Sequence, residues 1–519
     1  MTTRLKKIIA MSMILLGSLM STSAHAFDMA EFDEAINNFI QPFTSLYSDI
    51  IFYPIEINGQ DLPLIVIWLA MGSIFCTFYF KFINIRGFKI ALKIVRGDYA
   101  DKKDAGEVTH FQALTAALSG TVGLGNIGGV AVAISLGGPG ATVWMILVGL
   151  LGMSAKFAEC TLGVKYRVIH EDGSVSGGPM YYLKQGLAEK GMPRLGMALA
   201  VLFSVCCVFA SFGGGNIFQI SQTVEQFQIV AGDHTTLFTE YRWAFGLAVA
   251  IAVGLVIIGG IRSIANVTSK LVPIMCIFYL IAALSILFGL YERIPYAFME
   301  IINGAFTPEA GYGGLIGVMI QGMRRATFSN EAGIGSAPIA HAAVKTKEPA
   351  TEGLVSLLEP FIDTVVVCTV TALVIVITGV YEDGSGLSGV KLTSQAFSSV
   401  YSWFPYVLAI AVLLFAFSTM ITWSYYGIKS WTFLFGNSKK VQIIYKLLFC
   451  CATVVGATMS LSEVVNFADA ANFSMAVPNL IGVFILAPVV RQCLISFMAK
   501  IKSGEIKSNR EVEAIETAS

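Results

Sequence analysis

Charged residues are scarce in this sequence: Asp, Glu, Lys and Arg together make up 13% of its 519 residues. A soluble globular domain carries roughly twice that share. The 34 acidic and 34 basic side chains cancel, so no excess of either sign favours a nucleic-acid partner. The pattern gives no indication of an obligatory protein partner either.

Residue types that usually build catalytic or metal sites are also few. The five His are scattered, and the nine Cys fall mostly in apolar runs without Cys-x-x-Cys spacing. We interpret these cysteines as small hydrophobic side chains rather than as disulfides or metal ligands. No Ser/His/Asp, metal-ligand or paired-carboxylate pattern stands out in the apolar segments. The sequence therefore predicts neither an enzyme nor a bound cofactor.

Apolar residues dominate instead, at 55% of the chain, and the mean hydropathy is +0.72. Long apolar runs predict an all-α membrane protein with about eleven transmembrane helices. No soluble domain fits between them. The predicted spans are 63–82, 113–135, 139–163, 196–220, 243–260, 268–291, 313–340, 355–380, 405–427, 443–461 and 474–497.

The N-terminal residues have the order of a secretory signal peptide. Arg4, Lys6 and Lys7 precede a short apolar run, and Ala24-His-Ala26 supplies small residues for cleavage. An uncleaved signal anchor is the alternative. We expect four regions: a signal peptide at 1–26, a periplasmic segment at 27–62, a transmembrane transporter domain at 63–497 and a cytoplasmic tail at 498–519.

Lys and Arg collect in alternate short loops, which predicts the orientation. Arg86, Lys89 and Lys93 follow the first span, and Lys165 and Arg167 follow the third, whereas loop 222–241 is poor in both residue types. The mature N-terminus is then periplasmic and the C-terminus cytoplasmic, in a bacterial inner membrane.

Two distant segments share the pattern Ser-x-x-x-Gly-x-Gly-[Asn/Ser]: Ser119–Asn126 and Ser329–Ser336. Glycine lets an apolar helix unwind, and the freed backbone groups then need protein, water or a ligand as partners. Five spans separate the motifs, and their spans run in opposite directions. This favours an inverted-topology repeat of five plus five helices with discontinuous helices, which is typical of transporters. Close packing of small residues is the alternative.

Four further groups of polar residues lie within apolar spans. Asn216 and Gln219 share a helical face in the fourth span, where they would bind a zwitterion or bond between helices. Ser418 and Thr419 are adjacent hydroxyls near Trp423, and such hydroxyls suit an alkali cation or bond to their own helix. Glu331, preceded by Arg324 and Arg325, indicates either a gating role or a neutralised structural cluster; Glu359 and Asp363, four residues apart, leave the same choice.

The sequence resembles the alanine or glycine:cation symporter family from about residue 60 to 495. The motifs that carry the resemblance are Gly137-Gly-Pro-Gly-Ala-Thr-Val-Trp144, Ser176-Gly-Gly-Pro-Met-Tyr-Tyr182, Arg325-Ala-Thr-Phe-Ser-Asn-Glu-Ala-Gly-Ile-Gly-Ser-Ala-Pro-Ile-Ala-His341 and Trp423-Ser-Tyr-Tyr-Gly427. The resemblance implies the five-plus-five inverted-repeat fold of sodium symporters.

The resemblance also implies roles for individual residues. Thr121 and Gly125 would meet the substrate carboxylate, while Asn216, Gln219 and Trp423 line the pocket together with Leu124 and Asn126. By similarity to the wider fold, oxygens around Ser119 and Val122, with Ser418 and Thr419 opposite, would hold sodium. Glu331 would belong to the gating half of the repeat.

Two departures fall in the inferred pocket. Many family members have Thr where this chain has Leu124, and Asn where it has Ser221. The resemblance therefore implies sodium-coupled uptake of a small neutral amino acid, most simply alanine or glycine, by alternating access. Serine or glutamine as substrate, proton coupling and an ion channel remain the alternatives.

Overall fold

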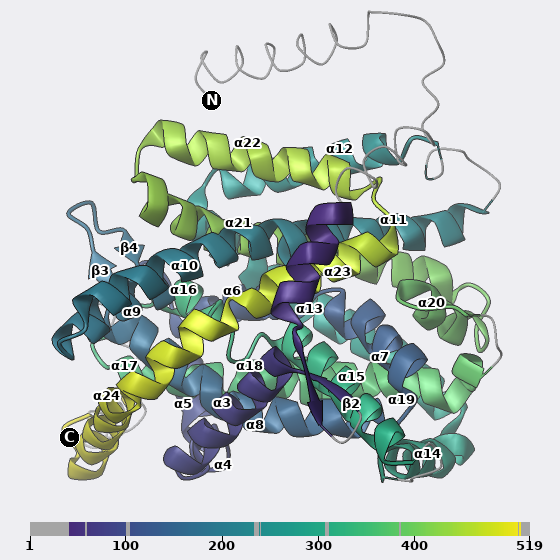
Figure 1. The fold of residues 1–519 in the computed structure, drawn as a ribbon, viewed down its shortest axis with the longest axis horizontal. Coiled ribbons are helices and arrows are strands. Elements are labelled where there is room, and N and C mark those ends of the chain that lie inside the picture. The colour runs from purple at the N-terminus through teal and green to yellow at the C-terminus, as the bar shows by residue number, and fades with distance from the viewer. Residues whose placement is uncertain are drawn as a thin grey trace, which may run out of the picture.

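The computed structural model describes residues 41–57, 60–99, 104–232, 238, 240–306, 311–382, 386–506 and 508–509. The predicted signal peptide at 1–26 lies outside these residues, as do the start of the predicted periplasmic segment and the end of the C-terminal tail, 510–519. Helices build nearly all of the described chain (Figure 1).

The described N-terminal part comprises a helical segment at 41–51, a hairpin and three further helices. Strands β1 and β2 pair antiparallel, and Tyr47, which precedes them, donates a hydrogen bond of 2.9 Å to Ser474. Helix α3 packs against α8 and α24. These elements are β1 (Pro54–Ile57), β2 (Gln60–Pro63), α3 (Leu64–Tyr79), α4 (Ile83–Arg86) and α5 (Phe88–Arg96).

The next elements run from residue 110 to residue 289 and contain the first interrupted helix. A capping box of Thr109 and Gln112 starts the first of these helices. The elements are α6 (His110–Thr121), η1 (Gly125–Gly129), α7 (Val130–Gly137), α8 (Ala141–Lys165), β3 (Val168–Ile169), β4 (Val175–Ser176), α9 (Pro179–Glu189), α10 (Pro193–Phe212), η2 (Gly213–Ile217), α11 (Phe218–Ala231), α12 (Arg242–Ile257) and α13 (Gly260–Gly289).

The remaining elements contain the second interrupted helix. They are η4 (Tyr291–Arg293), α14 (Ile294–Phe306), α15 (Gly311–Asn330), α16 (Ala337–His341), α17 (Pro349–Ser356), α18 (Leu358–Pro360), η6 (Phe361–Cys368), α19 (Thr369–Thr378), η7 (Val380–Glu382), α20 (Val390–Ser398), α21 (Phe404–Phe435), α22 (Lys439–Gly456), α23 (Leu461–Ser474) and α24 (Ala476–Ser503). Helices α12 and α22 pack together along one edge, and α24 runs past α9 and α3 (Figure 1).

The predicted count of eleven spans is not confirmed. Each predicted range overlaps a helix, but within the described residues six helical runs are long and apolar enough to cross a membrane, or seven with the bent pair α6 and α7. Helices α3 and α12 are apolar but shorter. The range predicted as 474–497 belongs to a longer run, Leu461–Ser503, whose first part, α23, packs against η2 and α15.

Both glycine motifs interrupt helices, as the sequence predicts. The pieces on either side of the first break are bent by 51°. In the second, Glu331 adopts φ +56°, and Gly333 and Gly335 adopt φ +89° and +83°. This left-handed backbone favours glycine and is strained for Glu331, so its persistence needs support from the surrounding structure.

Candidate functional site

Side-chain amides hold the backbone of the first break. Helix α6 ends at Thr121, and η1 begins at Gly125. The Gly123 N–H donates to Asn126 Oδ1 at 2.9 Å, and the Leu124 N–H donates to Gln219 Oε1 at 3.1 Å. Gln219 also donates to the Gly214 carbonyl at 2.8 Å. The break is thus bonded directly to the π-helical region of η2 and α11.

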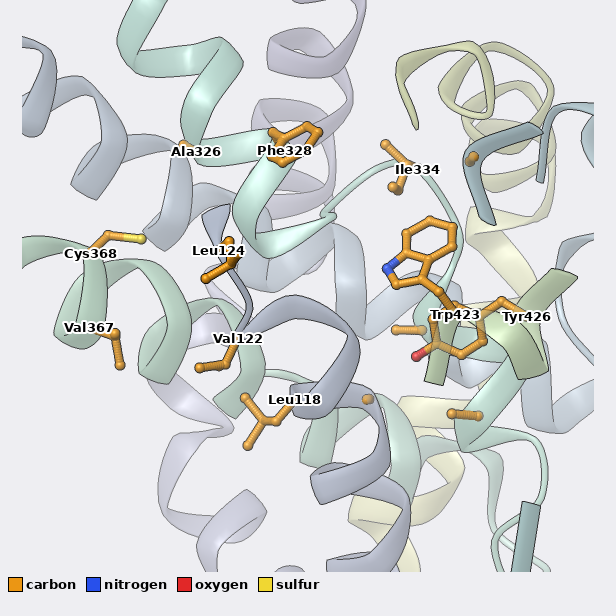
Figure 2. Close-up of a cluster of buried hydrophobic side chains, with 14 of the residues drawn as sticks. Leu118, Val122, Leu124, Ala326, Phe328, Ile334, Val367, Cys368, Trp423 and Tyr426 are labelled. Carbon is orange, nitrogen blue, oxygen red and sulfur yellow. The ribbon is translucent and has the colours of Figure 1, made fainter. Parts of the chain in front are cut away.

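A small cavity lies against this break. Five predicted site residues line it, four expected to contact the substrate and Glu331, which was expected to gate. In Figure 2, Trp423 lies on the right, opposite the thin backbone segment that carries Val122 and Leu124. The lining residues are Gly120, Thr121, Gly123, Gly125, Gly214, Gln219, Phe328, Glu331, Trp423 and Asn472.

The second break reaches the same cavity through Glu331. Trp423 Nε1 donates to Glu331 Oε1 at 2.9 Å, and the Ser336 hydroxyl donates to Glu331 Oε2. Arg324 and Arg325, which precede Glu331 in sequence, both pair with Asp469 instead. Of the two alternatives, a cluster in which both arginines neutralise Glu331 does not form, because α15 directs both guanidinium groups toward α23.

The four residues predicted to hold sodium belong to two facing segments. The Ser119 hydroxyl donates to the Ser418 carbonyl at 2.6 Å, and the Ser418 hydroxyl donates to the Phe415 carbonyl of its own helix at 2.9 Å. A Cβ at Gly123, next to Val122, would lie 2.4 Å from Thr419 Oγ1. That hydroxyl is buried and has no hydrogen-bond partner within the described part of the chain, so it is a protein oxygen open to a further partner.

Three residues predicted to line the pocket lie outside it. Asn216 donates to the Phe449 carbonyl at 2.7 Å and accepts from Thr453 at 2.9 Å, so it joins η2 to α22. Asn126 donates to Asp363 Oδ1 at 2.6 Å. The Leu124 side chain is fully buried and is absent from the cavity lining. Asn216 and Gln219 lie three residues apart and were expected to share a helical face, but the π-helical turn directs them to different neighbours.

Sequence reasoning missed Asn472 and Phe328 as lining residues. Asn472 lies in α23, between two predicted spans, where no pattern marked it. Sequence reasoning also did not assign Asp363 to the site. The Asp363 carboxylate accepts from Asn126 and from the Ser329 hydroxyl at 2.9 Å. Asp363 and Glu359, expected on one face, have separate partners, since Glu359 pairs with Lys156 at 3.1 Å.

This chain is similar in sequence to known symporters. The model of the sodium:alanine symporter family matches residues 52–511. Sodium/alanine symporter AgcS of Methanococcus maripaludis is 41% identical over 431 residues, which cover 82% of this chain and 92% of that protein. The probable sodium/glutamine symporter GlnT of Bacillus subtilis is 35% identical over 444 residues, 85% of this chain and 89% of that protein.

A solved structure matches the fold. The crystal structure of MhsT in complex with L-phenylalanine aligns with a TM-score of 0.52 and 14% identity, and covers 76% of this chain and 99% of that chain. At this identity the likeness concerns the fold alone. It confirms the predicted five-plus-five inverted-repeat class with discontinuous helices.

Proposed function

This chain belongs to the sodium:alanine symporter family, and on that premise we propose that it takes up alanine or glycine together with sodium by alternating access. Members of the family are membrane transporters and not enzymes, and the coupled solutes are sodium and an amino acid. The observation that carries the finer proposal is that both helix breaks, Gln219 and Trp423 meet at one small cavity.

The carboxylate end of the substrate would lie at the first break. The start of a helix carries a partial positive charge, and η1 begins at Gly125. Thr121 would add its hydroxyl, which otherwise bonds weakly within α6, at 3.3 Å to the Leu118 carbonyl. The ammonium end would then lie beside the Glu331 carboxylate. This contact would connect substrate binding to the strained second break, where we expected a gating role.

The lining of the cavity supports a small substrate, because three large side chains, Phe328, Trp423 and Gln219, bound it. Alanine and glycine place little or nothing beyond Cα, whereas glutamine would require these side chains to move. The sodium/glutamine relative makes glutamine the substrate to compare directly.

We propose that sodium binds between Ser119, Val122, Ser418 and Thr419. The hydrogen bond from Ser119 to Ser418 already joins α6 to α21 at this point. A cation here would fix the end of α6, and with it the backbone that meets the substrate carboxylate. Substrate and ion would thereby stabilise the same arrangement, which is the energetic basis of coupling.

The proposal also covers the cellular membrane that holds the protein and its orientation there. We infer a bacterial inner membrane, with the N-terminus periplasmic and the C-terminus cytoplasmic, from the distribution of Lys and Arg. The regions 1–26, 27–62, 63–497 and 498–519 keep their proposed roles. We propose that no further protein is required for transport.

The test is uptake by the purified full chain in proteoliposomes. Labelled alanine, glycine, serine and glutamine are compared under an imposed sodium gradient, an imposed proton gradient and no gradient. We expect accumulation of alanine or glycine with the sodium gradient alone. Uptake that follows the proton gradient without sodium, or that prefers glutamine, contradicts the proposal.

A further inference from the structure

Five ionisable side chains form a continuous buried chain apart from the cavity. Lys156 donates to Glu359 at 3.1 Å, and the other Glu359 oxygen faces His341 Nε2 at 2.6 Å. His341 Nδ1 faces Glu352 at 2.5 Å, and the other Glu352 oxygen faces His110 Nδ1. All five side chains are at most 4% exposed. Ionisable groups within membrane segments mark pathways for ions or protons.

The contacts determine how many protons this chain holds. Three nitrogen–oxygen pairs join imidazoles to carboxylates, and each pair requires one hydrogen. Two neutral imidazoles supply one hydrogen each. One additional proton is therefore needed, because otherwise an imidazole lone pair would face a carboxylate oxygen.

The charge count leads to the same number. Ionised Glu352 and Glu359 contribute two negative charges, and Lys156 contributes one positive charge. The additional proton brings the chain to neutrality, whereas its loss leaves one uncompensated negative charge in the interior. Such a charge is strongly unfavourable in a buried site.

The chain joins the start of α6 to α16 and α17. His110 begins α6, which is disconnected at Val122 from the helix that follows. Just before α6, Val108 pairs with Val344, which follows α16, and Arg167 donates to the Ala105 and Ala342 carbonyls at 2.9 Å. The start of α6 is thus held against α16 and α17 by backbone contacts and by the buried chain.

We propose that His110, Glu352, His341, Glu359 and Lys156 form a proton-binding chain whose additional proton holds the start of α6 against α16 and α17. Separation of these elements exposes the imidazoles to water and releases that proton. Opening on this side, which carries Arg167, Lys345 and Lys347, is then linked to the local pH. This inference rests on the proposed alternating access, and it adds a proton site distinct from the sodium site.

Other ionisable groups lie within electrostatic reach of the chain. From α8 these are Glu159 and Cys160; Glu331 lies at the second break, Tyr426 on α21 and Arg167 after α8. Cys160, His341 and Glu359 are close enough together to hold a metal ion. Both nitrogens of His341 already face carboxylate oxygens, and the arrangement therefore favours a proton.

Two isosteric variants remove the additional proton without removing a contact. In Glu359→Gln the amide oxygen accepts from Lys156 and the amide N–H donates to a neutral His341. In Glu352→Gln the amide accepts from His110 and donates to His341. Each variant is neutral with no additional proton. Ser356→Ala is the matched control, because the Ser356 hydroxyl donates to the Gly353 carbonyl at 2.9 Å and bonds with Cys160, and neither residue belongs to the chain.

The first measurement is the melting temperature of the full chain in detergent from pH 5.5 to 8.5. Raising the pH removes the additional proton and weakens the docked arrangement, so wild type and Ser356→Ala should lose melting temperature relative to both Gln variants. The second measurement is exchange of labelled alanine across proteoliposomes at saturating sodium. We expect the rate to rise by about fivefold or more over this range in wild type, and to stay flat in the Gln variants.

Parallel pH profiles of wild type and both Gln variants, in melting and in exchange, overturn the inference. The two proposals fail in different ways. Loss of sodium-driven uptake in wild type at every pH contradicts the proposed function, and the melting comparison then still decides on the proton chain.

Discussion

Single side chains at the first break replace the hydrogen bonds that an intact helix would supply. Asn126 accepts from Gly123 and donates to Asp363, and Gln219 accepts from Leu124. An unpaired buried N–H costs about 1–3 kcal/mol, so these amides stabilise an interruption that would otherwise be unfavourable. The motif glycines predicted the break, but the residues that stabilise it come from other helices.

A pair of serines in α21 tests the sodium site. Ser418→Ala removes the Ser418 hydroxyl, one of the oxygens proposed to hold sodium, and we expect about a tenfold rise in the sodium concentration for half-maximal alanine uptake, equivalent to about 1.4 kcal/mol. Ser424→Ala is the control, since Ser424 makes the same local bond, 2.7 Å to Ile421. Equal sodium dependence in the two variants would reject the assignment.

At the scale of elements, the decisive feature is that two interrupted helices and α21 converge. Helix α15 packs against η1 and α7, and α6 packs against α21. The sequence predicted both interruptions and the importance of Trp423. It did not predict that both breaks line one cavity. That convergence depends on how the helices pack, which the local sequence does not encode.

The first break provides a prediction about backbone access. A Cβ at Gly125 would lie 3.4 Å from Ser329 Cα, and the further methyl groups of Val would fill the place proposed for the carboxylate. Gly125→Val should therefore reduce alanine uptake to background. Gly129→Ala, where a Cβ meets nothing within 4 Å, should transport normally. Normal uptake by Gly125→Val at equal expression would refute the substrate site.

At the scale of the whole molecule, buried ionic contacts connect distant parts of the chain. Asp469 on α23 pairs with both Arg324 and Arg325 on α15. Lys156 on α8 pairs with Glu359 on α18 across 203 residues of sequence. Each of these buried charges has a partner of opposite charge, and this pairing allows them to lie in the interior.

The Asp469 pair gives a prediction about stability. Breaking a buried ion pair from one side costs about 3–5 kcal/mol, because the other charge stays buried. Arg325→Gln and Asp469→Asn should each lower the melting temperature, and the double variant should lower it by less than the sum. Arg262→Gln is the control, because Arg262 is 66% exposed in its pair with Glu107 and should have little effect. Additive losses would show that Arg325 and Asp469 are not coupled.

The sequence by itself determined the membrane class, the positions of both breaks and the family, because hydropathy, glycine spacing and long motifs are local properties. It also selected Thr121, Gly125, Gln219 and Trp423, which do line the cavity. Only the tertiary structure decided that Asn216 and Asn126 bond elsewhere, that Asn472 joins the site and that five ionisable residues form one buried chain. These outcomes depend on which helix faces which, since packing brings together side chains hundreds of residues apart.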